Sequence, residues 1–173
     1  DKPFYDNSGG GATISGGEPL YQPEFTEAIL TLCRDAAVHT AVETSSATGW
    51  GLVERLLPLV DLWMCDVKHA LPERHRDLTG GDNRTVLSNI RGLSARKASI
   101  LLRLPLAPGL NDDEEGLRAL GAFAAEIRPS EGLEVIPYHR FGQGKYSRLR
   151  QEDPMGGRPA ASLLTPSKPV PSL

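Results

Sequence analysis

The sequence predicts an α/β protein built on a mainly parallel sheet or barrel. Five short apolar runs are spaced along the 173-residue chain, and the segments between them carry apolar residues at helical spacing. Strands that alternate with helices in this way are joined by crossover connections, which favour parallel pairing. The expected strands are residues 12–15, 40–44, 62–67, 99–104 and 133–138.

The clearest helical pattern covers residues 23–36. Pro23 suits the first turn of a helix because its fixed φ is already helical and its missing N–H is not needed there. The apolar residues follow the spacing of one helical face, which we expect to be the core side. These residues are Phe25, Ala28, Ile29, Leu32 and Cys33.

Three further helices are expected between the later strands. Residues 85–97 repeat the amphipathic pattern, and residues 51–59 form a weaker helix that Pro58 interrupts. Residues 112–127 follow Asn111, a favourable N-cap, and begin with four consecutive acidic residues. Acidic side chains stabilise a helix N-terminus through its dipole.

Composition narrows the class of protein. The net charge is −3, and the absence of a basic stripe argues against nucleic acid as a partner. No apolar run is long enough to span a membrane, and two distant cysteines form no disulfide framework, so we expect a cytoplasmic protein. We expect one domain over residues 1–150, followed by a loose Pro- and Ser-rich tail over residues 151–173.

Unusual residues follow several of the expected strands. In parallel α/β folds, ligands bind at the carboxyl ends of the strands. Because these ends meet at one edge of the sheet, polar residues located there predict a shared site. The candidates are Gly16, Gly17, Glu18, Glu43, Thr44, Asp66, Lys68 and His139.

Each candidate also has a plain structural interpretation. The glycine-rich stretch before Glu18 suggests a backbone pressed against a positively charged group, but it could equally be a tight turn with Glu18 favouring a helix N-terminus. Met64, Asp66 and Lys68 share one face of the third strand. Asp66 and Lys68 either solvate a ligand or form a buried ion pair with no ligand. His139 could be an ordinary loop histidine.

Five segments together resemble a known family, the glycyl-radical enzyme activating proteins of the radical S-adenosylmethionine superfamily. The resemblance extends over about residues 4–149, with the motifs in the family's order and spacing. The first motif is Ser-Gly-Gly-Gly-Ala-Thr-Ile-Ser-Gly-Gly-Glu-Pro-Leu, and the third is Met-Cys-Asp-Val-Lys-His. The matching segments are residues 8–20, 40–44, 64–69, 103–112 and 136–146.

The resemblance implies a partial (β/α)₆ barrel, here without its first βα unit, with S-adenosylmethionine bound in its mouth. Gly16, Gly17 and Glu18 would engage the amino group of the cofactor. Asp66 and Lys68 would hold its ribose and carboxylate end, with Thr44 beside them and His139 near the nucleoside. A monovalent cation would lie near the carboxylate, where this chain has Glu43 in place of the family's Asp. The implied cation ligands are Glu43, Thr44, Met64 and Asp66.

The family also implies a reaction. A reduced [4Fe-4S] cluster cleaves S-adenosylmethionine to a 5′-deoxyadenosyl radical, which abstracts a hydrogen atom from a glycine of a partner enzyme. The implied partners are therefore a glycyl-radical enzyme and an electron donor such as flavodoxin or ferredoxin.

One departure from the family is serious. Its cluster is held by a C-x₃-C-x₂-C loop, which this sequence lacks, and Cys33 and Cys65 are too few to replace it. We therefore expect an N-terminally truncated piece that holds no cluster and is inactive alone, so no catalytic residue is assigned. One alternative is a barrel that binds S-adenosylmethionine or a partner protein without catalysis. Another is a radical enzyme that acts on a small molecule.

Overall fold

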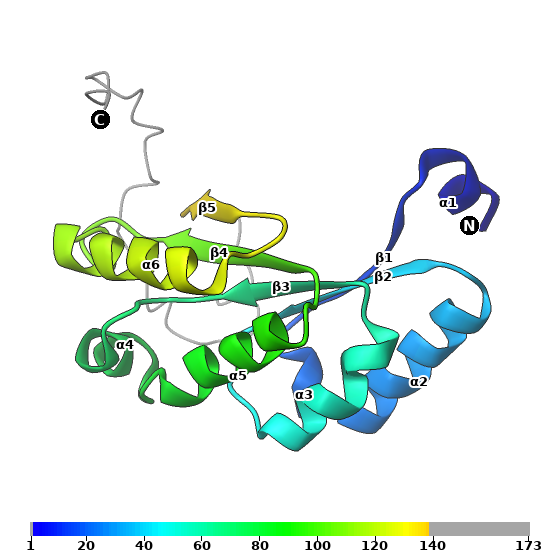
Figure 1. Cartoon of the computed structure of the whole chain (residues 1–173), viewed down its shortest axis with the longest axis horizontal. Helices are drawn as coiled ribbons and strands as arrows, with labels where there is room; N and C mark the ends of the chain where they lie inside the picture. The colour runs from blue at the N-terminus through cyan, green and yellow to red at the C-terminus, as the bar shows by residue number, and fades with distance from the viewer. Residues whose placement is uncertain (1, 139–173) are drawn as a thin grey trace, which may run out of the picture.

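Five parallel strands form one sheet in the sequential order β1-β2-β3-β4-β5 (Figure 1). The structure is a computed structural model that describes residues 2–138. All five predicted strands are confirmed, with their ends within two residues of the expected positions. The strands are β1 (Gly11–Ile14), β2 (His39–Thr44), β3 (Leu62–Asp66), β4 (Ile100–Leu106) and β5 (Leu133–Pro137).

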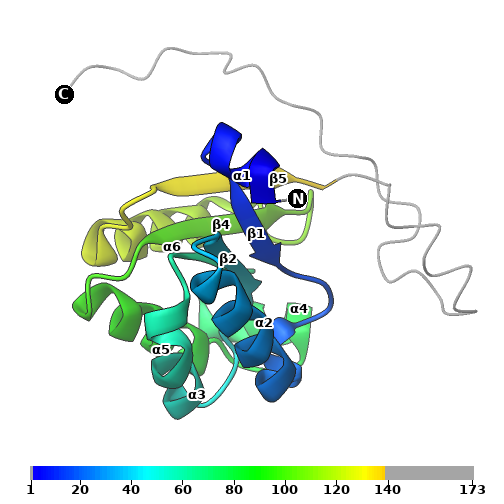
Figure 2. The ribbon, with the colours of Figure 1, turned by 90° about the vertical axis from the view of Figure 1, so that its right-hand side faces the viewer.

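The connecting helices cover one face of this sheet. Sequential strand order with crossovers of one hand places every connection on the same side, and α2, α3, α5 and α6 lie there together (Figures 1 and 2). The helices are α1 (Lys2–Ser8), η1 (Pro19–Tyr21), α2 (Pro23–Asp35), α3 (Trp50–Leu56), η2 (Leu57–Leu59), α4 (Pro72–Thr79), α5 (Arg84–Ala95) and α6 (Glu114–Ile127).

The core lies between the sheet and these helices. Trp63 and Cys65 of β3, with Val67 just beyond it, point into the core and are fully buried. Because side chains alternate along a strand, Met64 and Asp66 lie on the opposite face. The period of two thus separates an apolar face under the helices from a polar face that is free to build a site.

The helix over residues 23–36 is confirmed, but its predicted core face is wrong. The side chains buried from α2 are Thr26 and Leu30, whereas Phe25 is 64% exposed and Leu32 is 69% exposed. The hydroxyl of Thr26 donates to the carbonyl of Pro19 at 2.7 Å and turns this side of the helix toward η1. The apolar spacing therefore identified the helix but not the side that packs on the sheet.

The start of α6 also differs from the prediction. Asp113, not Asn111, is the N-cap, because its side chain accepts the backbone N–H of Gly116 at 2.8 Å. Asn111 instead uses its side chain to hold the loop before the helix. Helices α1 and α4 had no counterpart in the sequence prediction, and α3 ends before Pro58, as expected, where η2 begins at Leu57.

Within residues 2–138, no helix is long and apolar enough to cross a membrane. His139 and the predicted tail over residues 151–173 lie outside the described residues, so both remain expectations.

Candidate functional site

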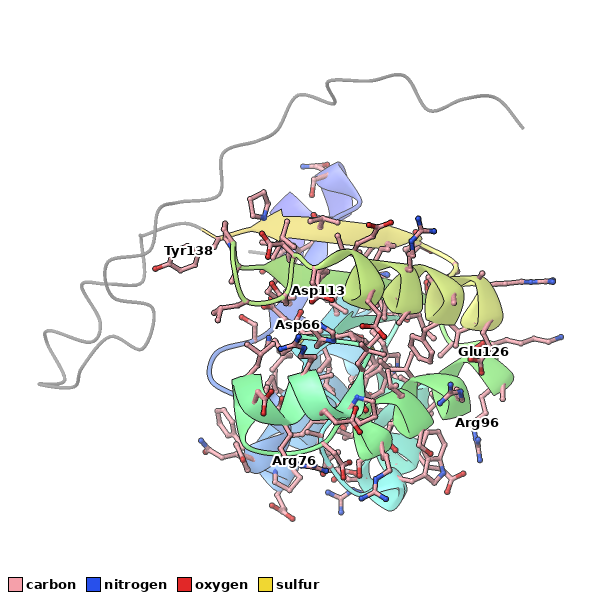
Figure 3. The ribbon with its side chains drawn as sticks, turned by 90° about the vertical axis from the view of Figure 1, so that its left-hand side faces the viewer. Asp66, Arg76, Arg96, Asp113, Glu126 and Tyr138 are labelled. Atoms are coloured by element: carbon pink, nitrogen blue, oxygen red, sulfur yellow. The ribbon has the colours of Figure 1, made fainter. Side chains whose placement is uncertain are left out.

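A polar cavity of about 190 Å³ opens at the carboxyl ends of β1, β2 and β3. We call it the polar pocket. Figure 3 shows Asp66 toward the same end of the molecule as Tyr138, which follows β5, whereas Arg96 and Glu126 lie toward the opposite end. The pocket is lined by Gly16, Gly17, Glu18, Glu43, Thr44, Ser45, Asp66 and Lys68.

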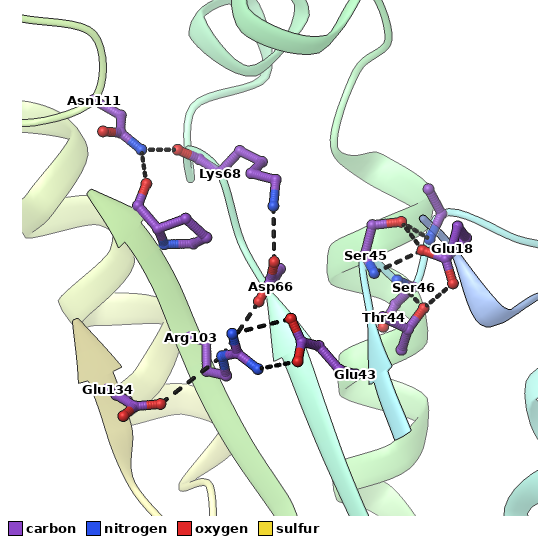
Figure 4. A network of polar contacts seen from close by, with 12 residues as sticks. Glu18, Glu43, Thr44, Ser45, Ser46, Asp66, Lys68, Arg103, Asn111 and Glu134 are labelled. Carbon is purple, nitrogen blue, oxygen red and sulfur yellow. Dashed lines mark hydrogen bonds and ion pairs between the residues drawn. The ribbon is translucent and has the colours of Figure 1, made fainter. Parts of the chain in front are cut away.

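Glu18 connects the loop after β1 to the end of β2. One carboxylate oxygen accepts the hydroxyl of Thr44 at 2.6 Å and the backbone N–H of Leu20 at 3.2 Å. The other oxygen accepts both the hydroxyl and the N–H of Ser45, at 2.6 and 2.9 Å (Figure 4). These four bonds use the roughly four acceptor positions of a carboxylate. Glu18 is also the N-cap of η1, so its structural interpretation is confirmed.

Gly16 gives the loop a backbone that other residues rarely adopt. Its φ is +130°, a value that strains residues with a Cβ, whereas Gly17 has no such requirement. A Cβ at either position would meet no heavy atom within 4 Å. The glycine pair therefore keeps the backbone bare along the open side of the pocket.

Asp66 and Lys68 form the ion pair that the shared strand face predicted. Lys68 Nζ lies 2.8 Å from Asp66 Oδ2, and the Lys68 side chain is still 37% exposed. The second oxygen of Asp66, Oδ1, is buried and has no hydrogen-bond partner. The nearest cation to this oxygen is Arg103 Nε at 3.5 Å, which forms an ion pair that is too long for a hydrogen bond.

Arg103 is the site residue that the sequence analysis missed. Its guanidinium pairs with Glu43 through two contacts, at 3.0 and 3.2 Å, and lies 3.5 Å from Asp66 and 3.8 Å from Glu134 (Figure 4). Burial works to lower the pKa of Arg103, but its contacts with Glu43, Asp66 and Glu134 raise that pKa above the ordinary value. Arg103 therefore stays charged beneath the pocket.

A signal for Arg103 was present in the sequence. Arg103 stands between Leu102 and Leu104 in an otherwise apolar strand, and only 8% of it is exposed. Because a buried cation needs carboxylate partners, such an arginine indicates acidic residues on the neighbouring strands. Glu43 and Asp66 were known candidates, but the register that brings them to Arg103 comes only from the fold.

The backbone of Lys68 is held from behind by buried side chains. Asn111 donates to the carbonyls of Lys68 and Pro105, both at 2.8 Å, and accepts the N–H of Ala107 at 2.7 Å. The next residue, His69, is 2% exposed, and its Nε2 lies 2.8 Å from Asp113 Oδ2. The turn that presents Lys68 is therefore tied to the loop before α6 and to the start of that helix.

The His69 ring also explains a glycine in α6. A Cβ on Gly116 would lie 2.5 Å from the ring atoms of His69, a distance that real structures do not tolerate. The hydrogen bond from His69 holds the pKa of Asp113 below its usual range, with a further contribution from the N–H of Gly116. This cluster fixes the turn at residues 68–71 without facing the polar pocket.

The structure brings most of the predicted site residues together. Gly16, Gly17 and Glu18 meet the side chains from β2 and β3 in one cavity, and only His139 lies outside the described residues. Met64 shares the face of Asp66 but does not line the cavity. Among the described residues, no group of three His, Cys, Asp or Glu side chains could hold a metal ion.

The two cysteines do not fit an iron–sulfur cluster. Cys65 is fully buried, and burial raises the pKa of its thiol to about 12, so it stays protonated. Cys33 lies on α2, on a different part of the molecule, and the sequence has no further cysteine. A cluster of this type needs several thiolates close together.

Comparison with known proteins agrees with this fold. Residues 5–120 match the family described as the Radical SAM superfamily, so the chain belongs to that superfamily. Within it, the chain belongs with the enzymes that activate glycyl-radical enzymes.

Two curated relatives and one solved structure illustrate this relationship. The chain is 40% identical to a choline trimethylamine-lyase activating enzyme of Oleidesulfovibrio alaskensis, over 94% of this chain and 53% of the relative. It is 42% identical to an isethionate sulfite-lyase activating enzyme of Nitratidesulfovibrio vulgaris, over 90% and 51%. A crystallised domain of a pyruvate-formate lyase-activating enzyme from Bacteroides vulgatus has a TM-score of 0.68 and 30% identity, covering 75% of this chain and 81% of that domain.

The chain spans about half the length of the curated relatives it matches. Its membership of the family is therefore shown for the shared region.

Proposed function

We propose that this chain binds the methionyl end of S-adenosylmethionine in the polar pocket and serves the activation of a glycyl-radical enzyme. The observation that carries the proposal is the charge of the pocket. Glu18, Glu43 and Asp66 supply three carboxylates against two cations, the ammonium of Lys68 in the pocket and the guanidinium of Arg103 beneath it, which leaves one net negative charge. A ligand with a sulfonium, an ammonium and one carboxylate complements that arrangement.

Different residues would bind different parts of the ligand. Lys68, whose ammonium has donors left after its bond to Asp66, would pair with the ligand carboxylate. Asp66, which lines the pocket, would accept a donor from the ligand. The pocket volume suits the amino-acid end rather than the whole cofactor, so the nucleoside would extend beyond it toward the predicted contact His139.

Glu18 would act differently from the direct ligand that the family resemblance implied. Its acceptor positions are taken by Thr44, Ser45 and Leu20. The ligand ammonium would therefore bind the bare backbone at Gly16 and Gly17, while Glu18 positions that loop and adds negative charge. Thr44, whose hydroxyl faces Glu18, would likewise support the loop. A monovalent cation at Glu43, Thr44, Met64 and Asp66 stays a prediction, and Arg103 already supplies a positive charge to both Glu43 and Asp66.

The bound cofactor would supply the 5′-deoxyadenosyl group that takes a hydrogen atom from a glycine of the partner enzyme. Residues of this chain would bind and orient that cofactor at the strand ends. They do not fit the [4Fe-4S] cluster, so no electron-transfer step is assigned to them. Binding of S-adenosylmethionine without catalysis is the second candidate function, because the chain has only two cysteines and one is a buried thiol. An electron donor such as flavodoxin or ferredoxin stays a prediction of the resemblance.

Calorimetric titration of the 173-residue chain with S-adenosylmethionine tests the proposal. We expect one binding site, and we expect Lys68→Ala and Asp66→Ala each to weaken binding at least about tenfold, since each removes a charge-assisted contact. Asp77→Ala, on the exposed side of α4, is the matched control and should bind like the unmodified chain. Equal affinity in all variants, or no binding at all, would overturn the proposal.

A further inference from the structure

A second cavity opens beside Lys68, between α4 and the loop that follows β4. Its volume is about 170 Å³, and we call it the apolar pocket. Most of its wall is made by side chains that carry no hydrogen-bonding group. The lining residues are Lys68, Leu78, Thr79, Pro105, Ala107, Leu110 and Asn111.

The polar side chains in this wall are already engaged within the protein. Asn111 donates to two backbone carbonyls and accepts one backbone N–H. The hydroxyl of Thr79 donates to the carbonyl of His75 at 2.8 Å and lies 3.0 Å from that of Gly81. Of the side chains lining the pocket, Lys68 therefore keeps donors for a ligand, and it stands at the edge facing Asp66.

The few free hydrogen-bonding groups in this wall limit what the apolar pocket can hold. A purine base would bring several ring nitrogens and an amino group into a wall whose side chains offer one free donor group, Lys68, and no free acceptor, which is costly. An aliphatic or aromatic side chain loses nothing there and gains from burial. The volume also accommodates one leucine or phenylalanine side chain.

The position of the pocket indicates where such a side chain would come from. Lys68 lines both cavities, so the occupants of the two pockets are neighbours. If the polar pocket holds the reactive cofactor, the neighbouring occupant belongs to the molecule on which that cofactor acts. For an activating enzyme this molecule is a polypeptide, and the glycine itself has no side chain to recognise.

We propose that the apolar pocket binds an apolar side chain next to the target glycine of the protein substrate. The inference rests on the proposed function, because it takes the substrate to be a polypeptide. Glycine has no side chain that the enzyme could bind. A neighbouring side chain bound between Leu78 and Leu110 would instead fix the position of the substrate segment that contains the glycine.

Methyl NMR of the 173-residue chain tests this, with two blocked hexapeptides as probes: Ser-Ser-Leu-Gly-Ser-Ser and its Leu-to-Ala counterpart. The Leu peptide should shift the methyl signals of Leu78 and Leu110 and bind about tenfold more tightly than the Ala peptide. Ala107→Leu, which fills the pocket, should abolish this preference. Leu110→Ser should do the same by making the wall polar, so the test does not depend on one variant folding. Leu117→Ser, on the exposed face of α6, is the control and should keep the preference.

Two results would overturn the inference. One is equal affinity for both peptides. The other is a shift of the Leu78 and Leu110 signals by adenosine, which would make the cavity a nucleobase site. The binding of S-adenosylmethionine, followed in the same samples, separates this failure from failure of the proposed function. If S-adenosylmethionine binds and the Leu peptide shows no preference, the inference alone is wrong. If S-adenosylmethionine does not bind, the proposed function is wrong whatever the peptides do.

Discussion

The polar pocket and the apolar pocket share Lys68 but handle hydrogen bonds in opposite ways. In the polar pocket, Asp66 Oδ1 is buried without a hydrogen bond, and three carboxylates line the cavity beside one ammonium. In the apolar pocket, Asn111 and Thr79 direct their polar atoms into the backbone. One cavity therefore presents charged groups to a ligand, and the wall of the other is mostly apolar.

The contrast between the two pockets shows that a buried polar residue near a site can have either of two roles. Asn111 and Arg103 are both buried and polar, and both lie close to Asp66 or Lys68 (Figure 4). Asn111 satisfies its neighbours and leaves no unmet demand, so its role is to position Lys68. Arg103 compensates charge but leaves an oxygen of Asp66 without a hydrogen bond. Three substitutions test this comparison.

Arg103→Ala should have the largest effect, because it removes the only cation that pairs with both Glu43 and Asp66 among the contacts described at this site. Leaving these carboxylates uncompensated should lower the free energy of unfolding by about 3 kcal/mol. Urea unfolding measures this, and Arg103→Lys should recover part of the loss by restoring the charge.

The matched control is Arg118→Ala, which breaks an exposed i,i+4 pair with Glu114. It should cost about 0.5 kcal/mol or less. If Arg103→Ala costs no more than this control, then the ion pairs of Arg103 with Glu43 and Asp66 do not stabilise the protein.

Asn111→Ala should have the next largest effect. It leaves the carbonyls of Lys68 and Pro105 without their donor and should cost about 2 kcal/mol in the free energy of unfolding. Because the turn that carries Lys68 loosens, affinity for S-adenosylmethionine should fall more than in Asp112→Ala, which changes an exposed neighbour. Unchanged affinity in a folded Asn111→Ala protein would refute a positioning role.

Asp113→Asn should have the smallest effect, and the effect depends on pH. The hydrogen bond from His69 lowers the pKa of Asp113 in the folded state, so the ionised carboxylate is favoured by folding. The resulting stability is present above about pH 4, the unfolded pKa of Asp, and is lost as the pH falls through the folded pKa. The unmodified protein should therefore lose stability more steeply below pH 4 than Asp113→Asn does.

Acid titration of stability by circular dichroism measures this slope. Asp82→Asn is a useful comparison, because the hydrogen bond from Arg84 lowers the pKa of Asp82 to about 2. Asp82→Asn should likewise make the loss of stability below pH 4 less steep. If stability falls equally steeply below pH 4 in Asp113→Asn and in the unmodified chain, the bond to His69 contributes nothing to acid sensitivity.

Much of the fold could be predicted from the sequence, because the information is local. The five strands and the helices over residues 23–36, 85–97 and 112–127 follow from the spacing of apolar side chains. The exposed Phe25 and Leu32 show the limit of that signal. Spacing defines a face of a helix, but which face is buried depends on where η1 and the sheet lie.

The candidate site, too, could be predicted only in part from the sequence. Gly16, Gly17, Asp66 and Lys68 could be chosen from the sequence, because polar or glycine residues at the ends of parallel strands converge. The bonds of Glu18 to Thr44 and Ser45 could not, since they join residues from different strand ends. The N-cap of α6 was misplaced for the same reason. Asn111 and Asp113 are both good caps locally, and only the turn at Lys68 determines that Asn111 is used elsewhere.

The amino-acid sequence alone predicted the parallel α/β class, the resemblance to the superfamily and the edge of the sheet where the candidate site lies. These depend on residue type and spacing along the chain. The contacts of Arg103 with Glu43 and Asp66, and the place of Lys68 between a polar and an apolar cavity, are seen only in the folded structure. Those features depend on strand register and on which hydrogen bonds are left unmade, and both are set by residues far apart in the chain.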